Sequence, residues 1–214
     1  MKYKLAIFDL DGTILETLED LYNSVNYALS QNNLPVRTLK EVRAFVGNGI
    51  RNLMIRSCPD NSPTEVVDMV HKTFVEHYSA HKADNTAPYE GIVDLLKTLK
   101  KEGYLLAVAS NKDDTAVKPL CEKFFEGLFD LTLGNRPDIA RKPAPDCVWK
   151  IIKDLGASLD DTVYIGDSEV DIETAKRAEV PCITVTWGFR DEPDLKKAGA
   201  TIIAHDVNEL KNLL

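Results

Sequence analysis

The sequence predicts an α/β fold, a Rossmann-like parallel sheet core with an inserted α-helical cap domain. Short apolar runs alternate with amphipathic helical patterns, as in a parallel sheet that helices cover on both faces. A block of about 70 residues near the N-terminus shows helical patterns only, which is too long for a simple crossover between strands. Two of the apolar runs end in acidic residues, where an open α/β sheet places its ligands.

The predicted strands are apolar runs of the length and composition of buried parallel strands. They are Lys4–Phe8, Leu105–Ala109, Leu131–Leu133, Thr162–Ile165, Cys182–Val185 and Thr201–Ala204. Helical spacing of apolar residues between them predicts helices over 92–99 and 148–155. Gly103 and Gly156 follow these two helices as stop signals.

The helical block predicts a separate domain. Thr38 and Glu41 have the spacing of a capping box, and so do Ser62 and Glu65, with Pro63 expected at the first helical position. We therefore expect a cap domain over residues 15–85. Residues 1–14 and 86–214 are expected to form the core domain.

Composition and charge narrow the function. The 214 residues carry a formal net charge of −8, which argues against a general nucleic-acid-binding protein but permits a small anionic substrate. No apolar run is long enough to span a membrane, and the first one ends at Asp9, too early for a signal peptide. Four scattered cysteines suit a reducing compartment. We expect a cytoplasmic monomer or homodimer with no membrane or nucleic-acid partner.

The first predicted strand leads into Asp9, Asp11 and Thr13. Two carboxylates separated by one residue repel each other unless a positive group joins them. An Asp-Gly pair is also common in ordinary turns, but this pair stands where the sheet would bind a ligand. The sequence thus points to a catalytic or metal-binding role for Asp9 and Asp11.

Three further segments bring polar residues to the same edge of the predicted sheet. Ser110 and Asn111 follow the second strand, and Lys142 precedes a helix. Asp167 and Asp171 follow a later strand. Carboxylates without His or Cys favour Mg²⁺. A metal ion and a lysine would also offset the repulsion between a carboxylate nucleophile and a phosphoryl group.

These motifs resemble those of the haloacid dehalogenase superfamily. The matching segments are Asp9–Thr13, Ser110, Lys142–Pro143 and Gly166–Asp171, in the family's order and with a helical cap after the first motif. The resemblance covers essentially the whole chain and is greatest to the phosphoglycolate phosphatases. It implies a Mg²⁺-dependent phosphatase of a small phosphorylated metabolite.

The resemblance also implies a role for each motif residue. Asp9 would be the nucleophile that forms an aspartyl-phosphate, and Asp11 the general acid and then the base. Ser110 and Lys142 would bind the phosphoryl group, with Thr13 and Asn111 as further substrate contacts. The Mg²⁺ ligands would be Asp9, Asp11 through its backbone carbonyl, and Asp167, with Asp171 in support.

The cap contains a second candidate segment, Gly47-Asn48-Gly49, followed by Arg51. Glycines permit close approach of the backbone and positive φ, and the segment is similar to the cap loop of phosphoglycolate phosphatases. We expect Gly47, Asn48, Gly49 and Arg51 to contact substrate, although an ordinary helix–helix turn would look the same.

Other functions remain open from the sequence alone. The same scaffold could serve a β-phosphoglucomutase-like mutase, a pyrophosphatase or a nucleotidase. A signalling receiver domain is an alternative of another class, because it also combines acids, a hydroxyl group, a lysine and Mg²⁺ on a parallel sheet. The large helical insert disfavours that alternative.

Overall fold

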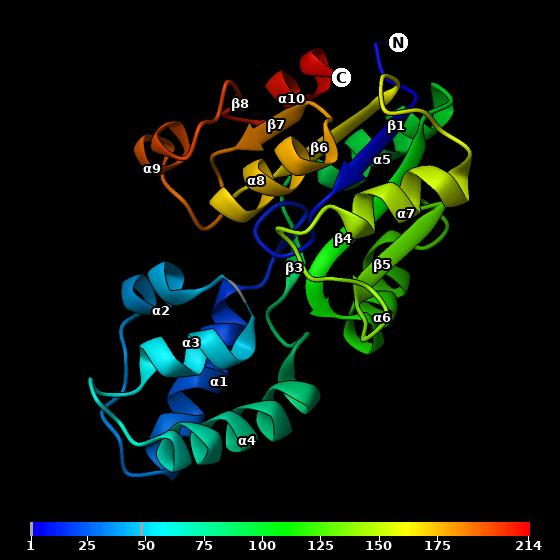
Figure 1. Ribbon diagram of the computed structural model, residues 1–214. Coiled ribbons are helices and arrows are strands. Elements are labelled where there is room, and N and C mark those ends of the chain that lie inside the picture. Colours follow the sequence, from blue (N-terminus) through cyan, green and yellow to red (C-terminus); the bar gives the residue numbers. More distant parts are fainter. Residues whose placement is uncertain (1, 48) are drawn as a thin grey trace. The chain divides into compact units, whose positions relative to one another are not determined.

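The computed structural model describes residues 2–47 and 49–214 and contains a six-stranded parallel sheet with the strand order β5-β4-β1-β6-β7-β8 (Figure 1). The strands are β1 (Leu5–Phe8), β4 (Leu105–Asp113), β5 (Leu131–Asn135), β6 (Thr162–Gly166), β7 (Cys182–Val185) and β8 (Ile202–Ala204). The predicted fold class is therefore confirmed. β1 is central because its side chains are apolar and fully buried.

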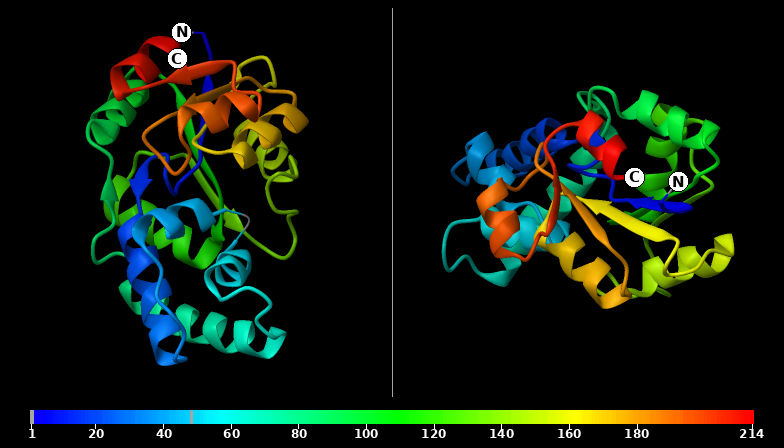
Figure 2. Two further views of the ribbon diagram at one scale, coloured as in Figure 1. Left: turned by 90° about the vertical axis from the view of Figure 1, so that its left-hand side faces the viewer. Right: turned by 90° about the horizontal axis from the view of Figure 1, so that it is seen from above.

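Helices cover both faces of this sheet (Figure 2). They are α5 (Ile92–Lys101), α6 (Asp114–Phe125), α7 (Asp146–Leu155), α8 (Glu169–Ala178), α9 (Glu192–Lys197) and α10 (Val207–Leu213). The apolar faces of α7 and α8 share one buried cluster with side chains of β1, β4 and β6. As predicted, α7 ends at Gly156, which takes the left-handed conformation.

The chain divides into two compact units, one of Met1–Leu15 with Pro88–Leu214 and one of Glu16–Ala87. The second unit contains α1 (Leu18–Gln31), α2 (Leu39–Phe45), α3 (Ile50–Ser57) and α4 (Thr64–His81). Its helices bury an apolar cluster of their own, which includes Val25, Met54 and Phe74. A separate core of this kind is what allows an insert to fold as a unit.

Local details of the helical unit differ from the sequence-based expectations. The short strands β2 (Leu15–Glu16) and β3 (Ala87–Pro88) pair where the chain enters and leaves the unit, but segments of two residues carry no periodic signal. The capping box of Thr38 and Glu41 is confirmed. The one predicted at Ser62 is wrong, because its hydroxyl donates to the Pro59 carbonyl and Pro63 takes the cap position.

None of the helices formed by the described residues 2–47 and 49–214 combines the length and apolar character that a membrane span requires.

Asp20, in the first turn of α1, holds the segment in which the chain leaves the helical unit. Its carboxylate is 2% exposed. It accepts hydrogen bonds from the backbone N–H and side-chain amide of Asn85, each at 2.9 Å, and from the backbone N–H and hydroxyl of Thr86, at 2.9 and 2.7 Å. Four donors thus depend on one buried side chain.

We predict that Asp20→Ala destabilises the helical unit by about 3 kcal/mol, because buried donors lose a charged acceptor. The matched control is Glu19→Ala, which removes an exposed acid from the adjacent position of α1. Urea unfolding of both variants measures the difference. Equal stability of the two variants would show that the Asp20 contacts contribute little.

Candidate active site

The strand register brings acidic residues from separate segments to one edge of the sheet. Phe8, the last residue of β1, pairs with Ile165 of β6 and with Val108 of β4. Asp9 follows directly, and its backbone N–H donates to the Ile165 carbonyl at 2.8 Å. Carboxylate oxygens of Asp9, Asp167 and Asp171 lie within 4.8 Å of one another. The parallel pairing thus assembles a cluster of three acids.

Lys142 lies among these acids. Its ammonium group is 2.9 Å from Asp9 Oδ1 and 2.8 Å from Asp171 Oδ1, and it donates to the Tyr164 hydroxyl at 2.8 Å. An ammonium group has three N–H donors, so each has a partner. Because the Lys142 side chain is 3% exposed, these contacts compensate for the loss of water around its charge.

The Asp171 carboxylate also organises its surroundings. Its Oδ2 accepts from the Ser168 hydroxyl at 2.6 Å and from the Ser168 backbone N–H, which forms a capping box at the start of α8. Its Oδ1 is within hydrogen-bonding distance of Tyr164 as well as Lys142. Asp171 thereby links the first turn of α8 to the lysine.

Burial dominates the electrostatics of this cluster. It raises the pKa of Asp9 well above the usual range, an effect that Asp171 and Asp167 strengthen and Lys142 opposes. Burial and the nearby Asp171 carboxylate raise the pKa of Asp167 to about 7. Although burial disfavours the charge of Lys142, Asp171 and Asp9 raise its pKa above the ordinary value. Two of the three carboxylates, Asp9 and Asp171, therefore share the ammonium group of Lys142, and Asp167 lies beside them.

The excess negative charge of this cluster fits a divalent cation. Asp9 and Asp167 offer hard oxygen donors, and in the described part of the chain no His or Cys joins the group that could hold a metal ion. Mg²⁺ prefers such oxygen ligands and needs few of them, since it keeps several waters. The donor set and its excess negative charge thus suit Mg²⁺ better than a transition metal.

Three glycines leave room for the acids. A Cβ atom on Gly12 or Gly188 would collide with the Asp167 side chain, and one on Gly166 would collide with Asp171. Gly12 also has a φ of 85°, in the left-handed region. Only glycine at these positions lets the backbone pass this close to the carboxylates.

Asp167 is held from two further segments. Its Oδ1 accepts from the Thr13 hydroxyl at 3.1 Å and its Oδ2 from the Phe189 backbone N–H at 2.7 Å. The indole N–H of Trp187 donates to the Thr13 carbonyl at 3.0 Å. Thr13, which we expected to contact substrate, therefore also positions Asp167. The loop after β7 supports the cluster through the Phe189 N–H.

The second acid of the first motif has its own cation. Asp11 Oδ1 lies 2.9 Å from the ammonium group of Lys112, whose side chain is 7% exposed. Lys112 belongs to β4, which continues to Asp113 with a register shift after Ala109. The sequence pattern ended this strand at Ala109 and assigned Lys112 no role. A lysine beyond a predicted strand end looks like any solvated charge.

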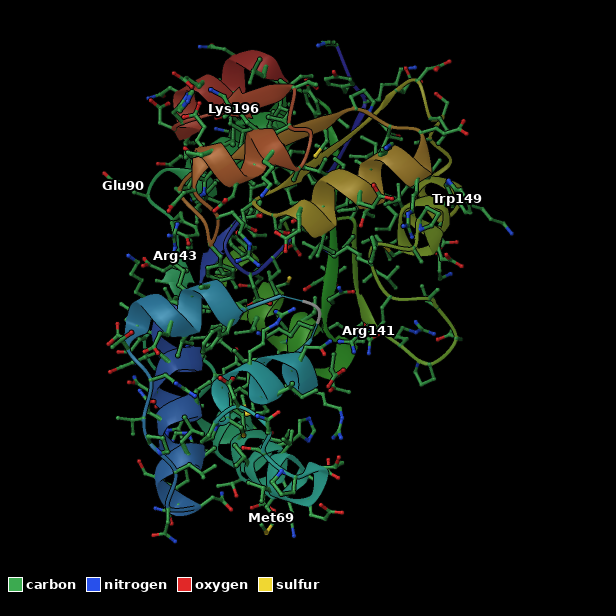
Figure 3. The ribbon with its side chains drawn as sticks, turned by 60° about the vertical axis from the view of Figure 1, so that its left-hand side comes forward. Arg43, Met69, Glu90, Arg141, Trp149 and Lys196 are labelled. Carbon is green, nitrogen blue, oxygen red and sulfur yellow. The ribbon has the colours of Figure 1, made fainter. Side chains whose placement is uncertain are left out.

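Ser110 and Asn111 occupy the same extension of β4. The Ser110 hydroxyl accepts from the Lys112 backbone N–H at 3.1 Å. The Asn111 side chain forms two hydrogen bonds with the backbone of Lys142, at 2.9 and 3.0 Å. Arg141, labelled in Figure 3, donates to the Asn111 carbonyl. Asn111 thus positions the segment that carries Lys142.

The predicted substrate contacts of the cap belong to the helical unit. Gly47 and Gly49 have positive φ values of 127° and 90°, and Gly49 precedes α3. Asn48 lies outside the described residues. Arg51, expected to contact an anion, forms an ion pair with Asp68 of the same unit. Substrate contact by these residues remains a prediction.

Comparisons with known proteins agree on one family. A model described as haloacid dehalogenase-like hydrolase matches residues 6–185. A phosphoglycolate phosphatase of Mesorhizobium japonicum is 31% identical over 96% of this chain and 92% of the relative, and one of Agrobacterium fabrum is 33% identical over 88% and 83%. The crystal structure of a candidate phosphoglycolate phosphatase from Lactobacillus delbrueckii superimposes with a TM-score of 0.95 at 40% identity, covering 100% of this chain and 98% of that one.

The Tyr164 hydroxyl provides a test of how the cluster is held. We predict that Tyr164→Phe lowers the free energy of unfolding by about 1–3 kcal/mol, because a buried N–H of Lys142 loses its acceptor. Tyr27→Phe, at an exposed tyrosine of α1, serves as the control and should change stability little. Thermal unfolding measures both. A Tyr164→Phe variant as stable as Tyr27→Phe would contradict the proposed importance of this contact.

Proposed function

The chain belongs to the haloacid dehalogenase-like hydrolase family, and from this membership and the acid cluster we propose that it is a Mg²⁺-dependent phosphatase acting through an aspartyl-phosphate. The observation that carries the proposal is the buried ammonium group of Lys142 between Asp9 and Asp171. It offsets the negative charge that otherwise keeps a phosphate group away from a carboxylate nucleophile.

The family resemblance predicted from the motifs is confirmed, and so is the prediction of an enzyme. A hydrolase family model that matches residues 6–185 leaves no support for the signalling receiver alternative.

In the proposed reaction an Asp9 carboxylate oxygen attacks the phosphorus atom. An Asp9–phosphate bond forms while the ester P–O bond breaks, and Asp11 donates a proton to the departing alkoxide oxygen. Water then attacks the same phosphorus atom and gives a proton to Asp11. The Asp9–phosphate bond breaks, which releases inorganic phosphate and restores both carboxyl groups.

The metal would be held by Asp9 and Asp167, by the backbone carbonyl of Asp11 and with support from Asp171. When bound, Mg²⁺ neutralises charge on the transferring phosphoryl oxygens. Lys142 keeps Asp9 oriented and balances its charge. Ser110 is proposed to donate its hydroxyl hydrogen to a phosphoryl oxygen, since its oxygen already accepts from the Lys112 backbone.

We propose 2-phosphoglycolate as the substrate because the relatives that cover nearly all of this chain are named phosphoglycolate phosphatases. Thr13, Asn111 and the cap residues Gly47, Asn48, Gly49 and Arg51 remain proposed substrate contacts. A mutase, pyrophosphatase or nucleotidase would share the site around Asp9, so a panel of phosphate esters, pyrophosphate and nucleotides distinguishes these activities.

The nucleophile is tested with Asp9→Asn. We expect phosphate release from 2-phosphoglycolate to fall about a thousandfold or more, because an amide oxygen is a poor nucleophile. Asp146→Asn, at an exposed acid in the first turn of α7, is the control and should retain activity. Activity of Asp9→Asn comparable to that of the control would refute the assignment.

Metal dependence is tested by removing divalent cations with EDTA. We expect phosphate release to cease and to return on addition of Mg²⁺, because Lys142 alone cannot balance three carboxylates and a phosphate group. Undiminished turnover by the metal-free protein would exclude the proposed metal.

A further inference from the structure

Two lysines of the site, Lys142 and Lys112, form ion pairs with different acids. All three N–H donors of Lys142 are engaged, by Asp9, Asp171 and Tyr164. Lys142 therefore has no N–H left to donate to another part of the substrate. The charge of Lys112 lies elsewhere, 2.9 Å from the Asp11 carboxylate.

The position of Asp11 defines what Lys112 can reach. In the proposed reaction Asp11 gives a proton to the oxygen of the leaving alcohol, so its carboxyl group must lie within hydrogen-bonding distance of that oxygen. In that reaction an ammonium group in direct contact with Asp11 lies on the side of the site that the leaving group occupies. The leaving group is the part of the substrate that distinguishes one phosphate ester from another, and Lys112 would adjoin it.

The backbone fixes Lys112 in this place. The Lys112 N–H donates to the Ser110 hydroxyl oxygen, and the extension of β4 through Asp113 carries both residues past the ends of β1 and β6. The Asn111 side chain ties the intervening residue to the backbone of Lys142. A positive charge held by a strand, with its side chain largely buried, is preorganised for an anion.

We propose that Lys112 binds the anionic group of the leaving alcohol and so selects phosphate monoesters of small hydroxy acids over neutral or cationic phosphate esters. This inference rests on the proposed phosphatase function and deepens it. Lys112 contributes specificity, whereas Lys142 supports the attack on phosphorus. The carboxylate of glycolate lies one carbon from the ester oxygen, within reach of a cation that adjoins Asp11.

The test compares three phosphate esters of similar size and different leaving-group charge: 2-phosphoglycolate, 2-hydroxyethyl phosphate and O-phosphoethanolamine. For the wild-type protein we expect kcat/KM to fall in that order. For Lys112→Met we expect kcat/KM for 2-phosphoglycolate to fall about tenfold or more while that for 2-hydroxyethyl phosphate changes much less. Lys112→Arg should retain most of the preference.

Lys118→Met is the matched control. Lys118 lies on α6 and pairs with Asp114 at the surface, so its loss should leave the preference unchanged. Inhibition by glycolate provides a second measurement that requires no turnover. Glycolate should inhibit the wild-type protein and Lys118→Met, and about tenfold more weakly Lys112→Met.

The possible results separate the two proposals. If Lys112→Met lowers kcat/KM by the same factor for all three esters and leaves glycolate inhibition unchanged, the specificity role is overturned. Lys112 would then act by supporting Asp11. If Lys112→Met does not fold, Lys112→Gln replaces it, and a preference for the carboxylated ester that is unchanged in that variant refutes the inference. Phosphate release that survives Asp9→Asn would instead refute the proposed function itself.

Discussion

The structure of the site depends on one ammonium group, that of Lys142, buried between two carboxylates. Without Lys142, Asp9 and Asp171 would be two like charges in a place from which water is largely excluded, and their repulsion would cost more than the surrounding contacts return. The neighbouring residues all serve this arrangement. Asn111 holds the lysine's backbone, Tyr164 accepts its third hydrogen, and Ser168 satisfies the far oxygen of Asp171.

Most of the fold could be predicted from the sequence because it depends on periodicity, which is a local property. The apolar runs that became β1, β6 and β7 were predicted to within one residue at each end, because an acid follows β1 and β6 and a proline precedes β7. β2 and β3 were not, since they are two residues long and owe their conformation to pairing with each other. The failure at Ser62 has a similar cause, because sequence spacing does not show that Pro63 takes the cap position and that the Ser62 hydroxyl donates to the Pro59 carbonyl.

The acids of the site could be predicted for a different reason. Parallel strands deliver their carboxyl ends to one edge, so Asp9 and Asp167 had to converge once the strands were identified. Lys112, Tyr164 and Phe189 could not be found in this way. Tyr164 is indistinguishable from a core residue of a buried strand, Phe189 acts through its backbone N–H, and Lys112 depends on an irregularity in β4 that no propensity encodes.

The pairing of β2 with β3 has a consequence for the history of the chain. Because the helical unit begins and ends on adjacent strands, its two junctions with the remaining chain are neighbours, and Asp20 closes the unit just inside them. A segment with adjacent ends and a core of its own can be lost, lengthened or exchanged without altering the register of the six-stranded sheet. Genetic exchange can therefore replace the helical unit while the acid cluster of the other unit stays in place.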